Sequence, residues 1–134
     1  MSFVKKIISD DWSGTKSNNL ESPGRTVEDA IDAVKQLNGR NHTQVVLKGE
    51  DRVLIVGGGN EGRYSVVLAF GDDEAFCTLV NPESTSTQDV IIVTGGQAGA
   101  FPQNQCVTLD AAIAAVSEFF DSGEPSRALA WERE

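Results

Sequence analysis

The sequence has few of the residues from which metal sites and nucleophilic sites are built. His42 is the only histidine, and the two cysteines, Cys77 and Cys106, lie far apart and form no Cys-x-x-Cys pair. A zinc site normally uses four such ligands at short spacings, so we predict no metal site and no cofactor. Each cysteine lies in an apolar, strand-like stretch, which favours two reduced core thiols. A disulfide between them stays an open alternative.

Long apolar runs, low-complexity tracts and interior linkers are also lacking. No apolar stretch approaches the roughly 20 residues that span a membrane. The first eight residues have neither the long apolar block nor the cleavage site of a secretory signal, so we expect a cytoplasmic protein. With 134 residues, of which 40% are hydrophobic, the chain is long enough for a single domain with one core, residues 1–134.

Enzyme motifs are missing or incomplete. Gly57–Gly62 matches G-x-G-x-x-G, but Arg63–Phe70 follows it and reads as a strand, whereas a dinucleotide site needs a helix there. We interpret these glycines as a hairpin turn. There is no G-x-S-x-G motif. The paired acids Asp10-Asp11 and Asp72-Asp73 are sequence neighbours in predicted turns, so their side chains point apart. Acid–base catalysis is therefore not expected, and we predict a protein that is not an enzyme.

Basic residues become scarce after residue 50. Residues 1–50 carry seven Lys/Arg and seven Asp/Glu, whereas residues 51–134 carry four and thirteen, which gives the whole net charge of −9. A surface of this sign repels nucleic-acid phosphates and favours a basic protein partner. The charge therefore argues against direct nucleic-acid binding. The alternative to a basic partner is that the acidic residues only keep the protein soluble.

The sequence pattern predicts an N-terminal arm, residues 1–24, followed by two helices and a series of short strands. In the arm, Val4–Ile8 suits an edge strand, and Lys16–Gly24 reads as a polar loop. Trp12, in a predicted turn between them, either plugs the core from a loop or anchors an interface.

Both helices have clear boundary signals. The first begins at Thr26, a hydroxyl N-cap, and stops at Asn38-Gly39. The second runs from Thr108 to Asp121. Its apolar residues recur at helical spacing and form one broad face: Leu109, Ala112, Ile113, Val116, Phe119 and Phe120.

Between and around the helices, short runs of β-branched residues predict strands. They are Gln44–Leu47, Val53–Val56, Arg63–Phe70, Ala75–Val80, Val90–Val93 and Ala98–Phe101. We place Val90–Val93 at the centre of the sheet, because it is continuously apolar. Tight turns favour antiparallel pairing, so we predict an α+β fold with a mainly antiparallel sheet of about six strands and two helices packed on one face.

Acidic side chains are concentrated in the predicted hairpin turns. Together with Trp12, the candidates for contact with a partner protein are Glu50, Asp51, Glu61, Asp72, Asp73 and Glu74. Loops on a rigid scaffold commonly carry binding function, and an acidic rim raises the association rate with a basic protein more than the affinity. The alternative is that these are ordinary solvated turns.

Several short motifs in the last third of the chain follow one another in a recognisable order. They are Val93-Thr94-Gly95-Gly96-Gln97, Phe101-Pro102, Cys106-Val107, Ala111-Ala112, Phe119-Phe120, Gly123-x-Pro125 and Ala130-Trp131-Glu132. In order and spacing they resemble the first of the numbered immunity-protein (Imm) families of bacterial polymorphic toxin systems. The agreement is strongest over residues 91–132 and looser over residues 26–70.

The resemblance implies an α+β cytoplasmic protein that binds a cognate secreted toxin, often a nucleobase deaminase, and blocks its active site. Three motif residues carry over, and we expect structural roles for them. Gly123 would permit a left-handed helix stop, Pro125 would fix the turn, and Trp131 would pack against the preceding helix.

Two other functions fit the same pattern. One is a cytoplasmic regulatory or scaffold module that binds another protein without any toxin. The other is a small ligand-binding domain that uses the Gly57–Gly62 turn. The sequence identifies neither the toxin, nor the face that binds it, nor the oligomeric state.

Overall fold

The computed structural model describes residues 3–23, 26–71, 75–84, 86 and 88–133. Within these ranges the chain forms two α-helices, nine strands and two short 3-10 turns, Asn60–Gly62 and Gln103–Gln105. The elements, in chain order, are β1 (Lys6–Ser13), β2 (Lys16–Pro23), α1 (Val27–Lys35), β3 (Gln44–Lys48), β4 (Arg52–Gly58), β5 (Tyr64–Phe70), β6 (Ala75–Val80), β7 (Asp89–Thr94), β8 (Gln97–Pro102), α2 (Leu109–Ser122) and β9 (Ala130–Arg133).

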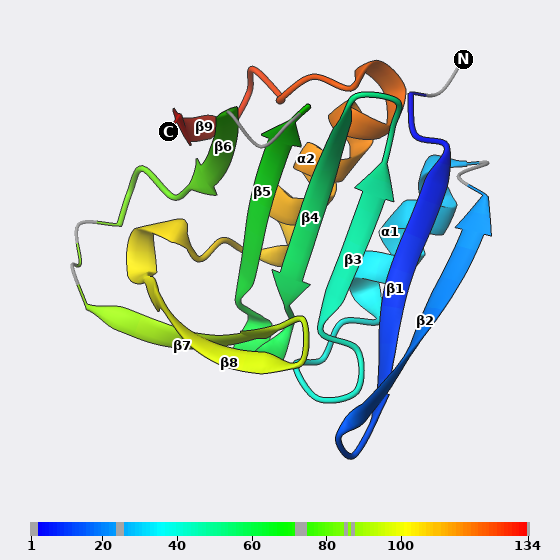
Figure 1. Ribbon diagram of the computed structural model, residues 1–134. Helices are drawn as coiled ribbons and strands as arrows, with labels where there is room; N and C mark the ends of the chain where they lie inside the picture. The colour runs from blue at the N-terminus through cyan, green and yellow to red at the C-terminus, as the bar shows by residue number, and fades with distance from the viewer. Residues whose placement is uncertain (1–2, 24–25, 72–74, 85, 87, 134) are drawn as a thin grey trace.

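A seven-stranded main sheet organises the fold. Its order is β2-β1-β3-β4-β5-β6-β9, and every neighbouring pair is antiparallel. Figure 1 shows both helices behind this sheet, while the separate β7–β8 hairpin crosses the lower ends of β4 and β5 in front of it. The predicted α+β architecture, with an antiparallel sheet and two helices on one face, is confirmed.

The core lies between the main sheet and the two helices. Six side chains of β3, β4 and β5 have no exposed surface: Val45, Leu47, Leu54, Val56, Val66 and Leu68. The helices bury Ala30, Val34, Ala112, Val116, Phe119 and Phe120 against them. The helical spacing of these residues is the reason that each helix forms and turns this face to the sheet.

Side chains cap both helices at the predicted residues. The backbone N–H of Asp29 donates to Oγ1 of Thr26 over 3.2 Å, and the N–H of Ala111 donates to Oγ1 of Thr108 over 3.3 Å. Gly123 ends α2 in the left-handed region with φ +75°, as the sequence predicts, and its N–H donates to the Phe119 carbonyl over 2.8 Å. The ring of Phe3 packs on this stop, since a Cβ at Gly123 would lie 2.6 Å from its Cδ1.

Replacing Gly123 should therefore combine backbone strain with a steric clash. We expect Gly123→Ala to lower the free energy of unfolding by about 2–4 kcal/mol. The matched control is Gly14→Ala, because Gly14 has φ +64° and nothing within 4 Å of a Cβ. This control carries only the backbone strain, about 1 kcal/mol. Urea unfolding followed by circular dichroism measures both, and equal losses would contradict the role of the Phe3 contact.

The N-terminal arm is where the prediction is wrong. Residues that read as an edge strand, a turn and a polar loop form the β1–β2 hairpin instead. β1 is not an edge strand, because it pairs with both β2 and β3, and the edge is β2. All eight residues of β2 are exposed, so polar side chains are tolerated on both of its faces and the strand shows no apolar alternation.

β7 is the second correction, because it is not at the centre of the main sheet. It pairs with β8 through the Gly95-Gly96 turn, where both glycines have positive φ. Ile92 is fully buried but Ile91 is 52% exposed, so β7 buries only one face. The stretch around Cys106, which reads as strand-like, is not a strand either: Val107 makes an isolated bridge to Tyr64 after a 3-10 turn.

Candidate partner-binding surface

The acidic turns separate to opposite ends of the main sheet. Glu50 and Asp51 lie in the β3–β4 turn, next to the start of the β5–β6 turn, where the Gly71 N–H donates to the Asp51 carbonyl over 2.6 Å. Glu61 lies in the turn at the other end of β4, in an ion pair of 2.6 Å with Arg63. The remaining candidates, Asp72, Asp73 and Glu74, lie outside the described residues. The structure therefore brings Glu50 and Asp51 together but keeps Glu61 away.

Arg52 holds the Asp51 end of the sheet to the C-terminal end of α2. Its guanidinium pairs with Asp51 and Glu124, each over 3.2 Å, and donates to the Gly123 carbonyl over 3.0 Å. It also lies 5.0 Å from the ring centroid of Phe70. The hydrogen bond to Asp51 raises the pKa of Arg52, so its charge is permanent. Asp51 is thereby fixed in position, and both Asp51 and the adjacent Glu50 are exposed.

The main sheet has a second face, opposite the helices, which we call the outer face. One row of paired residues crosses this face from edge to edge, and we call it the outer row. It comprises Glu21, Ile8, Val46, Ile55, Val67, Thr78 and Glu132. The four aliphatic members are half-buried, while the glutamates at the two ends are exposed. These residues alternate along each strand with core residues such as Leu47, Leu54 and Leu68, which point to the helices.

A second row lies beside it, toward the β3–β4 turn. Lys48, Val53, Ala69 and Phe76 are successive partners across β3 to β6. A hollow of about 460 Å³ opens at the end of these strands, and its lining joins Lys48, Val53 and Ala69 to the turn residues Glu50, Asp51 and Gly71. The acidic turn is therefore continuous with the outer face.

The β7–β8 hairpin covers the opposite end of the outer face. Thr94 lies over Gly57 so closely that a Cβ there would be 2.1 Å from its Oγ1. Ile92 packs against Gly58 in the same way, because a Cβ at Gly58 would lie 3.0 Å from the Cγ2 of Ile92. The side chain of Asn60 fixes β7, because it donates to the Ile91 carbonyl over 3.0 Å and accepts from the Val93 N–H over 3.2 Å. Gly57 and Gly58 belong to the glycine run predicted as a turn. Because they have no side chains, they also allow the β7–β8 hairpin to pack closely against the sheet.

Asp10 is a buried carboxylate that the sequence reasoning placed in a turn. It is 6% exposed. Its Oδ1 accepts the backbone N–H groups of Thr43 and Gln44 over 2.7 and 3.0 Å, and its Oδ2 accepts from the Thr43 hydroxyl and, over 2.7 Å, from the Trp12 indole. The Gly96 N–H then donates to the Thr43 hydroxyl over 2.9 Å. Asp10 therefore joins β1, β3 and the β7–β8 turn.

Trp12 belongs to this network. It lies near the end of β1, is half-buried, and covers Gly96, where a Cβ would be 2.1 Å from its Cζ2. It is a strand residue at the junction of β1 and the β7–β8 turn, and is not among the residues of the main core.

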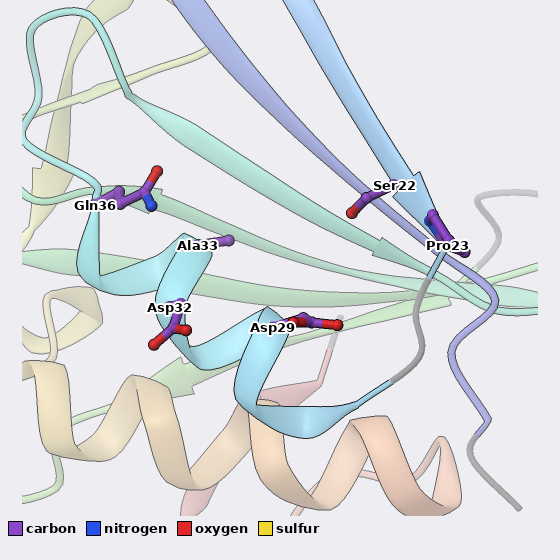
Figure 2. A pocket seen from close by; sticks show the side chains of 6 residues that line it. All are labelled: Ser22, Pro23, Asp29, Asp32, Ala33 and Gln36. Carbon is purple, nitrogen blue, oxygen red and sulfur yellow. The ribbon is translucent and has the colours of Figure 1, made fainter.

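Two carboxylates of α1 line another hollow, away from the outer face. A hollow of about 430 Å³ lies between β2 and α1, and Figure 2 shows Ser22 and Pro23 across from Asp29, Ala33 and Gln36. Its carboxylates, on Asp29 and Asp32, are exposed. Within the described ranges, no three His, Cys, Asp or Glu residues are grouped as a metal site requires.

The side chains of Cys77, Cys106 and His42 are buried or half-buried in the fold. Cys77 is buried and Cys106 half-buried, and both are free thiols. Burial raises the pKa of the Cys106 thiol, which lowers its reactivity as a thiolate. His42 is half-buried, with Nδ1 2.9 Å from the carbonyl oxygen of Asp10.

The other two motif residues lie after α2. Pro125 is half-buried in the segment that follows Gly123. Trp131 is half-buried on β9, opposite Leu79, and its indole N–H donates to the Ser126 carbonyl over 3.0 Å. Trp131 packs against the main core, so it holds β9 to the sheet.

Comparison with known proteins identifies a family. The family described as Immunity protein Imm1 matches residues 20–133, which contain every helix and every strand from α1 to β9. No curated protein and no solved structure matches the chain. In the described part of the chain, neither helix has the length and apolar character to cross a membrane.

Proposed function

Because the chain belongs to the Imm1 family of immunity proteins, we propose that it binds its cognate toxin in the cytoplasm of the producing cell and covers the toxin's active site. We further propose that this toxin is a nucleobase deaminase. The family match is the observation that carries the proposal. The inhibitor acts by occlusion and performs no chemistry itself.

The distribution of charge supports a deaminase as the target. An enzyme that acts on bases in nucleic acid binds a phosphate backbone, so the mouth of its active site is basic. This chain carries a net charge of −9. Glu50 is exposed, and Arg52 holds Asp51 in place beside it, so two carboxylates stand at one end of the sheet before a partner arrives. Such a turn attracts a basic surface and speeds encounter.

The proposal is tested with the product of the gene next to this chain's gene, which we expect to encode the toxin, co-expressed with the chain and then separated from it. We expect the two proteins to form a stoichiometric complex, and the chain to abolish deamination of cytosine or adenine in single-stranded substrates. Size-exclusion chromatography measures the complex and product analysis measures the activity. A bound toxin with another activity would refute the deaminase part alone. A toxin that does not bind would favour a regulatory module instead.

The same assay tests the acidic turn. Glu50→Gln combined with Asp51→Asn should slow association about tenfold at low salt and weaken its salt dependence. The matched control removes two charges from exposed positions on α2, Glu118→Gln with Asp121→Asn. Equal slowing by both pairs would mean that net charge alone matters, and that the turn has no special part.

A further inference from the structure

We infer that the toxin docks on the outer face of the main sheet, with the outer row at the centre of the interface. The occupant is a toxin surface that presents an apolar cluster with basic groups on both sides. This inference rests on the proposed function, and it names the face of the chain and the chemistry of the surface that it fits.

The first argument is the composition of the central strands. In an antiparallel sheet with one solvated face, apolar residues alternate with polar ones. β3, β4 and β5 depart from this pattern, because Val46, Ile55 and Val67 on the outer face are as apolar as the core residues beside them. Strands that are apolar on both faces are typical of sheets covered on both sides.

The second argument is that the chain supplies only part of this cover. The β7–β8 hairpin lies over one end of the outer face, at Gly57 and Gly58. Figure 1 shows no described element in front of the sheet beyond that hairpin, toward the β3–β4 turn. Ile8, Val46, Ile55 and Val67 remain half-buried there. A contiguous apolar patch with a polar rim marks an interaction site.

The third argument is charge, which selects the occupant. The outer row ends in a glutamate at each edge of the sheet, Glu21 on β2 and Glu132 on β9. Six inter-strand steps of about 4.8 Å each separate their backbones by about 29 Å. That span matches the width of a standard interface, which buries about 800 Å² on each partner. A surface with an apolar centre and basic flanks is therefore complementary to the whole row.

Two exposed cations of the chain, Lys6 and Lys48, are strand partners beside the row. Lys6 pairs with Glu21 over 3.4 Å, but both side chains are about half exposed, at 48% and 56%. An exposed pair of this kind is weak, so a basic group of the partner competes for Glu21 at little cost.

The opposite side of the molecule, which α1 and α2 form and which we call the helix side, has exposed acidic side chains without an apolar centre between them. Its exposed carboxylates are those of Glu28, Asp29, Asp32, Asp110, Glu118 and Asp121. The apolar faces of α1 and α2 are already buried against the sheet. This side therefore serves solubility, and it supplies matched control positions.

The decisive variant is Val46→Thr, Ile55→Thr and Val67→Thr together. Threonine favours strands and is close to valine in shape, so the sheet should persist while the apolar centre is lost. We expect Kd for the neighbouring toxin to rise at least about 100-fold. The control is Leu20→Thr with Ile91→Thr, which changes two large apolar residues that are exposed elsewhere in the described part of the chain, at 50% and 52%. This control should change Kd less than about twofold.

A charge variant tests the flanks. Glu21→Lys with Glu132→Lys should slow association about tenfold at low salt, and more than Asp110→Lys with Glu118→Lys on α2. The two pairs change net charge equally, so the comparison isolates the position of the charges. A larger effect of the α2 pair would place the toxin on the helix side and overturn the inference.

A measurement on the unaltered protein completes the test. Carbene footprinting of the free chain and of its toxin complex should show at least about fivefold protection of Ile8, Val46, Ile55 and Val67, because interface cores exclude solvent. Leu20 and Ile91 should stay as reactive as before. Toxin that binds without protecting the outer row overturns this inference alone. Toxin that does not bind overturns the proposed function and, with it, the assignment of the face.

Discussion

Asp10→Ala should lower the free energy of unfolding by about 3–5 kcal/mol, because it removes one acceptor that serves several buried donors at once. The backbone N–H groups of Thr43 and Gln44, the Thr43 hydroxyl and the Trp12 indole would all lose their partner. Each unpaired buried donor bears its desolvation penalty without compensation. Chemical denaturation of the variant and the unaltered chain measures the loss.

The adjacent Asp11→Ala is the matched control. Asp11 lies on the same strand, but its side chain points to the opposite face of the sheet, so we expect a loss below about 0.5 kcal/mol. Amide hydrogen exchange adds a local readout, because the Gly96 N–H depends on the Thr43 hydroxyl that Asp10 orients. In Asp10→Ala this amide should exchange faster than in Asp11→Ala. Similar losses of stability for the two variants would contradict the network.

Phe119→Ala should cost a similar amount, about 3–5 kcal/mol, through the cavity that it leaves. Phe119 is 1% exposed, and its ring meets that of Phe3 edge to face with centroids 5.4 Å apart. Loss of the ring removes apolar burial from the centre of the core and also the support of Phe3.

Phe101→Ala is the comparison for this variant. Phe101 is half-buried on β8, away from the main core, so we expect a loss of about 1–2 kcal/mol. Thermal unfolding of both variants measures the difference. Equal losses would mean that the small sheet contributes as much to stability as the main core does.

The sequence predicted the parts of the fold that local signals determine. Thr108, the apolar spacing of α2 and the Gly123 stop all act within a few residues of one another, and the structure contains them as predicted. The β1–β2 hairpin and the place of β7 depend on pairing between distant segments. Because β2 is polar on both faces, its composition predicted a loop. Because β7 is apolar, its composition predicted a place at the centre of the sheet.

The candidate surface was likewise predictable where local signals determine it, and not where it depends on pairing between distant segments. The sequence located Glu50 and Asp51 in a turn, where the structure has them, but their separation from Glu61 follows from the direction of β4. The outer row exists only through the register of six strand pairs. One signal for it was available: the unbroken apolar runs around Val46, Ile55 and Val67 indicate a sheet with two covered faces.

The Arg52 contacts have a consequence for folding kinetics. They join Phe3, Phe70 and Gly123, which are far apart along the chain. Closing such long loops is entropically costly until the strands between them have assembled, so we expect this cluster to form late on the folding path. Contacts that are absent from the transition state act mainly on the unfolding rate. We therefore expect substitution of Arg52 to change the unfolding rate more than the folding rate.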